Sequence, residues 1–359
     1  MEGNPESSWG HHNSTMDIVL DVLDTLVLDR LYAALLPAPE GVRPVAVEYN
    51  SHVARYMELQ PTKWAGMSQL ARDSIIRQMF SLFLLTWIFG VLVYFVSSTL
   101  SFFFVFDKKF MMHPKFLRDQ INLEIKQSMR AMPVMAALTA PFFVAELRGY
   151  SRLYDFPSEA PFQLYTYLQF PLFIAFTDFC IYWIHRALHH PLIYKWLHKS
   201  HHKWIVPTPY ASFAFNPVDG WSQSVPYHVF PFVFPLQKTA YLMLFAFVTV
   251  WTVIIHDGEY ATSSPVINGS ACHTYHHLYF NYNYGQFTTL WDRLGGSYRQ
   301  PDAELFDREI KMGKSQWEKQ VKEMEKIVRE LRERMTGSME RCRRRCSDLF
   351  LMNTYLHYI

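Results

Sequence analysis

Half of this chain's sixteen histidines are concentrated in three short groups, and each group repeats spacings of three or four residues. On an α-helix, side chains three or four positions apart lie on the same face. Each group therefore predicts a set of imidazoles that point in one direction. The eight residues are His185, His189, His198, His201, His202, His273, His276 and His277.

This pattern indicates a metal site. A lone histidine is usually a hydrogen-bonded core residue, but that explanation does not account for three such groups in one chain. Neutral imidazole suits Zn, Cu, Fe and Ni, and eight imidazoles exceed what one ion accepts, so two metal ions are expected to share a cavity. Cys272, directly before His273, is either a soft ligand or, as we favour, a small buried neighbour.

Iron is the best candidate, because open non-haem iron sites activate dioxygen. The carboxylate-bridged di-iron design requires Glu-x-x-His pairs on helices, and the zinc hydrolase design requires His-Glu-x-x-His. Neither motif occurs in this sequence.

The composition is typical of a membrane protein. Half of the residues are apolar and 17% are aromatic, whereas only 18% are charged. The net charge of +2 gives no sign of a nucleic-acid partner, and we expect none. The fold class that follows is all-α, an integral membrane helical bundle with about four spans or two hairpins, and with a histidine-rich helical cap on the cytosolic side.

Three apolar stretches are candidate spans. Met79 to Phe106 carries no formal charge and is long enough to cross the bilayer. Met132 to Ala145 is shorter and contains two prolines, and the segment between these two stretches is expected to be a Lys/Arg-rich cytosolic loop. Pro161 to Trp183 is the third candidate, with the single charge Asp178 inside it.

Two shorter apolar runs, Val225 to Leu236 and Tyr241 to Ile255, lie between the second and third histidine groups. They are expected to form a hairpin that enters the membrane and returns. An odd number of crossings here would place the ligands on opposite sides of the bilayer, and no shared site would form. His256 follows the second run and is a ninth candidate ligand, and His228 is a less secure one.

Two carboxylates are candidates for orienting ligand imidazoles. An ionisable residue at membrane depth is functional by default, and Asp178 lies two helical turns before His185. We expect Asp178 to orient a ligand, with a buried structural hydrogen bond as the alternative. Asp257, next to His256, is expected to act in the same outer sphere.

The ends of the chain lack such chemistry. Met16 to Leu36 predicts an amphipathic helix, either at the lipid surface or packed against a neighbouring helix. Gln316 to about Met335 alternates charge and predicts a solvated helix. We divide the chain into a polar segment with an amphipathic helix at 1–70, a membrane-embedded domain at 71–300 and a charged cytosolic helix and tail at 301–359.

Beyond the histidine groups, several segments resemble a known family. They are His113-Pro-Lys-Phe-Leu-Arg-Asp-Gln120, Tyr182-Trp-Ile-His185, His198-Lys-Ser-His-His-Lys-Trp204, Asn216-Pro-Val-Asp-Gly220, Gln223-Ser-Val-Pro-Tyr-His228 and Ile255-His-Asp-Gly258. The histidine groups resemble the histidine boxes of the fatty acid hydroxylase and sterol desaturase superfamily of the endoplasmic reticulum. The other segments are similar to fungal sterol C-5 desaturases, also called lathosterol oxidases.

The resemblance implies removal of two hydrogens from C-5 and C-6 of a Δ7-sterol in ergosterol synthesis. It implies two non-haem irons on the eight histidines, with His256 and His228 less securely placed. Dioxygen is the oxidant, and cytochrome b5 and its reductase pass on electrons from NADH or NADPH. The sterol reaches the site from the bilayer of the endoplasmic reticulum, and the histidine boxes face the cytosol.

Two other functions stay open at this point. A sterol C-4 methyl oxidase or a fatty acid hydroxylase of the same superfamily would carry the same boxes. A histidine-rich metal transporter is a more distant alternative.

Basic side chains lie beside the histidine groups, such as Lys195 and Lys199. They either anchor the protein at the membrane interface or receive an acidic electron-donor protein.

Overall fold

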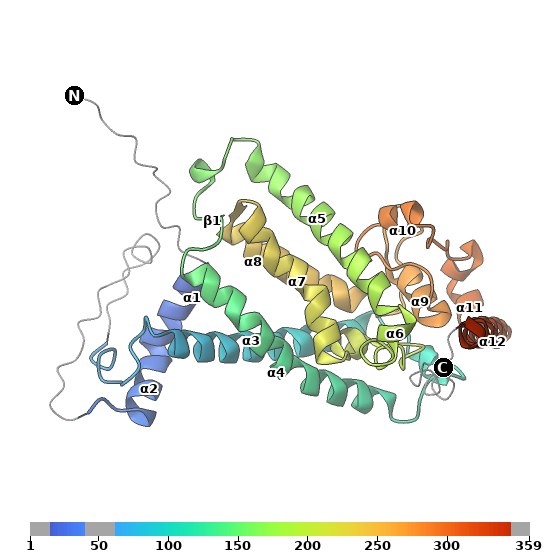
Figure 1. The fold of residues 1–359 in the computed structure, drawn as a ribbon, viewed down its shortest axis with the longest axis horizontal. Coiled ribbons are helices and arrows are strands. Elements are labelled where there is room, and N and C mark those ends of the chain that lie inside the picture. Colours follow the sequence, from blue (N-terminus) through green and yellow to red (C-terminus); the bar gives the residue numbers. More distant parts are fainter. Residues whose placement is uncertain (1–14, 40–61, 346–359) are drawn as a thin grey trace. The chain divides into compact units, whose positions relative to one another are not determined.

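A computed structural model describes residues 15–39 and 62–345 of this chain, and within them the fold is helical. The exceptions are two strands of two residues each, β1 (Leu153–Tyr154) and β2 (Leu236–Gln237), which pair in parallel. The expected class of an all-α membrane protein is confirmed (Figure 1). The end of the tail, from 346 onward, lies outside the described residues.

Within the described residues, three helices are long and apolar enough to cross a membrane: α3 (Ile75–Phe104), α4 (Gln120–Leu147) and α5 (Tyr165–Leu188). At about 1.5 Å per residue, each exceeds the roughly 30 Å of a hydrocarbon core. A fourth apolar helix, α8 (Lys238–Ile254), has 17 residues and is shorter than a full crossing.

The prolines do not end the helices that contain them. α4 continues through Pro133 and Pro141, and α7 (Pro217–Val233) contains two prolines of its own. Membrane helices tolerate proline because neighbouring groups satisfy the freed carbonyls.

The expected basic loop between the first two spans is wrong in its second half. Lys126 and Arg130 lie on α4, which begins at Gln120.

The N-terminal helical segment comprises α1 (Thr15–Leu23), a π-helical turn η1 (Asp24–Leu28) and α2 (Asp29–Leu35). Its acidic face packs against the protein: Asp24 and Asp29 each lie 2.6 Å from the buried guanidinium of Arg77, and Arg72 binds Asp29 at 2.5 Å. The opposite face exposes Leu26. The amphipathic helix was expected either at the lipid surface or packed against a neighbouring helix. Its polar face packs against a neighbouring helix, since Arg77 lies on α3.

The chain forms two compact units, and α3, α4, α5, α7 and α8 each contribute residues to both. Among the described residues, one unit comprises 15–39, 62–94, 129–177 and 220–249, and the other comprises 95–128, 178–219 and 250–345. The hairpin of α7 and α8 leaves the second unit and returns to it. The histidines before and after the hairpin therefore lie in the same unit, as a shared metal site requires.

The charged C-terminal helix is present as α12 (Lys314–Arg345), which contacts α9 (Ser270–Tyr279) in the same unit (Figure 1). Its first turns are solvated on one face only, because the other face is buried. Trp317 is buried and packs against the ring of His113, with centroids 5.4 Å apart, and Met324 is also buried. The start of this helix thus belongs to the core of its unit.

We predict that Arg77→Gln lowers the free energy of unfolding in detergent by about 3–5 kcal/mol, because it leaves two buried carboxylates without their shared cation. The matched control is Arg30→Gln, which changes an exposed arginine on α2 and is expected to alter stability by less than about 0.5 kcal/mol. Equal losses in the two variants would contradict the role of Arg77.

Candidate metal centre

Each histidine group lies on a short segment that fixes its direction. His185 lies in the last turn of α5, and His189 follows with its N–H 3.2 Å from the carbonyl of His185. His273, His276 and His277 lie on α9, which is buried throughout. The second group differs from the helix that was expected: it lies in consecutive turns after α6 (Pro191–Tyr194).

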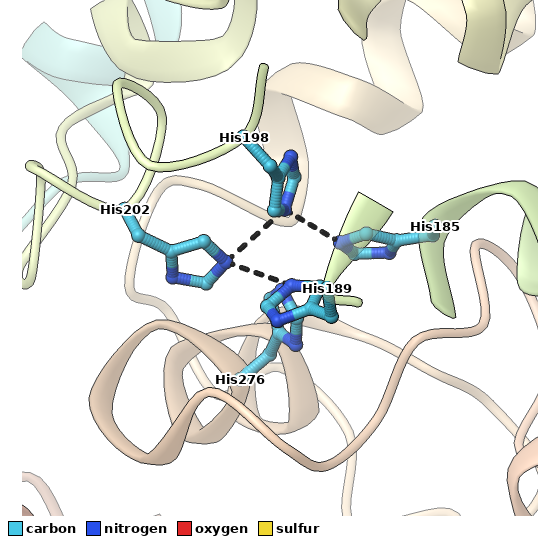
Figure 2. Close-up of side chains that lie close together, drawn as sticks. All are labelled: His185, His189, His198, His202 and His276. Atoms are coloured by element: carbon cyan, nitrogen blue, oxygen red, sulfur yellow. Dashed lines mark hydrogen bonds between the residues drawn. The ribbon is translucent and has the colours of Figure 1, made fainter. Parts of the chain in front are cut away.

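Five histidines converge with their ligand atoms within 4.8 Å of one another, and we call this set the five-histidine cluster (Figure 2). The Nε2 atom of His198 lies 3.1 Å from Nε2 of His185 and 3.1 Å from Nε2 of His202. Nε2 of His202 lies 3.1 Å from Nε2 of His189. The members are His185, His189, His198, His202 and His276.

Four further histidines form the four-histidine cluster, also with their ligand atoms within 4.8 Å. Nε2 of His273 lies 3.0 Å from Nε2 of His256 and 3.2 Å from Nε2 of His277. His201 completes the set. His256 thus lies among the other candidate ligands, although more than fifteen residues separate it from any of them along the chain.

Two adjacent pairs of histidines are divided between the clusters. His202 and His276 belong to the first cluster, and their neighbours His201 and His277 belong to the second. His276 and His277 are consecutive residues on α9 and point about 100° apart, so this pair cannot face a single point. The pairs therefore hold the clusters next to each other, and the ring centroids of His202 and His277 are 5.0 Å apart.

The partners of the Nδ1 atoms determine the tautomers. Nδ1 of His185 lies 2.9 Å from the carbonyl of Tyr284, and Nδ1 of His198 lies 2.8 Å from the carboxylate of Asp219. Both oxygens only accept hydrogen bonds, so each Nδ1 donates and each neutral ring carries its lone pair on Nε2. Two lone pairs then face each other at 3.1 Å, an arrangement that a cation between them stabilises.

Two further rings also donate Nδ1–H to a backbone carbonyl. His256 and His276 place Nδ1 2.7 Å from the carbonyls of Thr252 and Tyr282, respectively. Nε2 of His276 is buried and has no hydrogen-bond partner among the described residues. Binding a metal ion would satisfy this nitrogen.

Burial keeps the rings neutral. Desolvation, followed by the neighbouring imidazoles, holds the pKa of His202, His273 and His277 well below the usual value. Burial also lowers the pKa of His256 to about 4. At neutral pH the nitrogens are therefore lone-pair donors.

The donor set and spacing fit a metal. Imidazole nitrogens lie about 2.0–2.1 Å from a zinc ion, and two ligands at about 90° on an ion of such size lie about 3 Å apart. The observed Nε2 separations are 3.0–3.2 Å. Nine imidazoles without a carboxylate or thiolate in either cluster suit Fe, Zn, Cu or Ni.

His228 belongs to neither cluster. It lies in the other unit, where its ring contacts Phe142 and Phe143 and its Nδ1 is 3.4 Å from the hydroxyl of Tyr241. The structure thus gives His228 an aromatic environment, in contrast to its expected place among the ligands.

The two carboxylates expected to orient imidazoles bind backbone instead. Asp178 accepts the N–H groups of residues 286–288 and contacts no described imidazole by hydrogen bond. Asp257 accepts the N–H of Glu259 at 2.8 Å, in the turn at Gly258. Asp178 therefore makes no direct hydrogen bond to His185, because its carboxylate oxygens accept the N–H groups of the 286–288 loop.

The sequence pattern does not single out the carboxylate that orients a clustered imidazole. Asp219 lies in the first turn of α7 and is fully buried against His198. Its sequence signal is its place in Asn216-Pro-Val-Asp-Gly220, a segment that marks the family resemblance. The carbonyls of Thr252, Tyr282 and Tyr284 leave no such signal, because every residue has a carbonyl.

Comparisons with known proteins agree with this site. The fatty acid hydroxylase family, a family of non-haem iron enzymes, matches residues 170–297, which contain all nine clustered histidines. No solved structure matches the chain.

Curated relatives match nearly the whole chain. Delta(7)-sterol 5(6)-desaturase erg3B of Aspergillus fumigatus is 65% identical and covers 91% of this chain and 97% of its own length. A probable Delta(7)-sterol 5(6)-desaturase of Neurospora crassa is 58% identical, with 88% and 95% covered. Delta(7)-sterol 5(6)-desaturase ERG3 of Saccharomyces cerevisiae is 46% identical, with the same coverage. The chain therefore belongs to the Delta(7)-sterol 5(6)-desaturases, oxidoreductases within the fatty acid hydroxylase family.

Proposed function

We propose that this protein introduces the C5–C6 double bond into a Δ7-sterol, at two iron ions held by the five-histidine and four-histidine clusters. The observation that carries the proposal is the convergence of Nε2 lone pairs in two adjacent clusters within one unit. The names of the relatives supply the sterol and the bond.

The reaction balances with dioxygen as the oxidant. The sterol loses one hydrogen from C-5 and one from C-6, and two electrons from NADH or NADPH enter through cytochrome b5 and its reductase. With two protons, dioxygen becomes two water molecules. When bound, the irons supply the activation of dioxygen.

The protein's own residues orient and shield the ligands. Asp219 and the carbonyl of Tyr284 hold Nδ1–H of His198 and His185, so that each Nε2 points into the cluster. Such outer partners fix the tautomer and raise the basicity of a ligand. The clustered rings are mostly buried, which excludes bulk water from the oxidising centre.

We further propose that the sterol enters from the bilayer of the endoplasmic reticulum and that the clusters lie on its cytosolic side. Three helices able to cross a membrane support the first part. The aromatic ring of Phe215 stacks on His201 with centroids 4.2 Å apart, which offers a flat apolar surface beside the four-histidine cluster. A sterol, itself flat and apolar, suits such a surface.

Basic side chains near the clusters support an acidic electron donor. Lys195, Lys199 and Lys203 lie on the turns that carry the second histidine group. Arg186 has a different role, because its guanidinium donates to the carbonyl of Gly295 at 2.8 Å and to the hydroxyl of Tyr182 at 2.5 Å. The lysines therefore carry the proposed docking of cytochrome b5.

We predict that membranes containing this protein, supplied with a Δ7-sterol, NADH and air, form the conjugated 5,7-diene, which is measured by its ultraviolet absorbance. His201→Ala is expected to lower the rate by at least about 100-fold, because it removes a ligand. His190→Ala is the control: this residue caps α6 outside both clusters and should keep activity. A hydroxylated product without diene would instead favour a C-4 methyl oxidase or a fatty acid hydroxylase, and full activity of His201→Ala would favour a transporter.

We also predict that the purified chain binds two ferrous ions and that Asp219→Asn weakens one of the two sites by about 10–100-fold. The amide keeps the size of the side chain but loses the charge that orients His198. Metal analysis and equilibrium titration measure both numbers. A wild-type stoichiometry of one ion or none would contradict the two-cluster proposal.

A further inference from the structure

Two carboxylates bind the backbone of the loop between α9 and α10 (Leu290–Leu294). Five consecutive N–H groups donate to them. Those of Tyr284 and Gly285 donate to Asp292, each at 2.8 Å. Those of Gln286, Phe287 and Thr288 donate to Asp178, at 3.0, 2.8 and 3.2 Å.

Both carboxylates are buried, with Asp292 0% and Asp178 1% exposed. The donors found around them are neutral: apart from the five N–H groups, they are the hydroxyls of Ser297 and Thr288. A buried carboxylate is costly unless hydrogen bonds compensate it, and charge-assisted bonds to backbone N–H groups are the strong kind. Two buried carboxylates on one five-residue loop indicate that the backbone of this loop is held in one fixed position.

The loop presents a carbonyl to a candidate ligand. The peptide group between Tyr284 and Gly285 is planar, with its N–H and its C=O on opposite sides. Its N–H, from Gly285, donates to Oδ2 of Asp292 at 2.8 Å. Its C=O, from Tyr284, accepts Nδ1–H of His185 at 2.9 Å. One peptide group therefore joins the carboxylate to the imidazole.

This relay has an electrostatic consequence. A negative charge on the N–H side polarises the peptide and strengthens the carbonyl as an acceptor. A stronger acceptor at Nδ1–H holds the ring of His185 and raises the basicity of its Nε2. His198, whose Nε2 lies 3.1 Å from that of His185, receives the same support directly from Asp219. The two neighbouring ligands are thus each linked to a carboxylate.

Gly285 allows the carboxylate to approach this closely. A Cβ at this position would collide with the carbonyl oxygen of Thr288 and come within 3.0 Å of Oδ2 of Asp292. A side chain here would therefore push the peptide away from the carboxylate. The loop's path depends on glycine at the one residue whose N–H and preceding carbonyl form the relay.

We propose that Asp292 is a positioning residue of the five-histidine cluster, acting on His185 through the 284–285 peptide, and that Asp178 holds the rest of the loop in register. The inference rests on the proposed function in one respect, namely that the five-histidine cluster binds an ion. The sequence pattern favours a direct bond from Asp178 to His185. The inferred link instead runs from Asp292 through the 284–285 peptide to His185.

The test is a titration of the metal-free, full-length protein in detergent with cobalt(II), followed by the visible absorption bands of the bound ion. Asp292→Asn is expected to weaken one site by about 10–100-fold and the other by less than about 3-fold. Asp178→Asn is a second probe and should weaken the same site by a smaller factor, because Asp178 binds the loop beyond the 284–285 peptide. Asp155→Asn is the control, because it alters a buried carboxylate paired with Lys238 in the other unit and should change neither site.

A double-mutant cycle separates positioning from general stability. In the His185→Ala background, Asp292→Asn should weaken cobalt binding by less than about 2-fold, since the relay then has no ligand to act on. Equal effects with and without His185, or equal weakening of both sites, would overturn the inference. If the wild type binds no cobalt at all, the proposed metal centre fails instead, which is a different result.

Discussion

The proposed chemistry of this protein depends on imidazole nitrogens that converge in two buried clusters. Nε2 atoms in both clusters are 3.0–3.2 Å apart, and acceptors at Nδ1 of His185 and His198 force their lone pairs inward. Such facing lone pairs repel one another unless an ion lies between them. Much of the surrounding structure is therefore best understood as the scaffold that holds these rings in place.

That scaffold relies on buried acceptors of two kinds. Backbone carbonyls of Thr252, Tyr282 and Tyr284 accept from three of the rings, whereas the carboxylate of Asp219 accepts from a fourth. Carboxylates also act at a distance, since Asp292 holds the peptide that holds His185. A buried carboxylate costs free energy unless donors surround it, and Asp292 accepts from two backbone N–H groups and the hydroxyl of Ser297.

The membrane imposes the second constraint. Histidines before and after the α7–α8 hairpin meet because the chain leaves one unit at the hairpin and returns to it. Prolines inside α4, α5 and α7 do not interrupt these helices. At the N-terminus, carboxylates buried against Arg77 leave apolar side chains such as Leu26 outward, the reverse of a water-soluble helix and the arrangement expected beside lipid.

The sequence by itself determined the helical membrane class, the three histidine groups and the addition of His256, because periodicity and donor chemistry depend only on the order of residues. It did not determine how nine histidines divide into five and four, since the adjacent pairs at 201–202 and 276–277 point to different clusters only once the backbone is folded. It also offered His228 as a less secure ligand, and Asp178 either as a residue that orients a ligand imidazole or as the acceptor of a buried structural hydrogen bond. Tertiary structure decided between these, because long-range contacts gave Asp178 a loop to bind and His228 an aromatic setting, and such contacts between distant residues leave no local pattern in the chain.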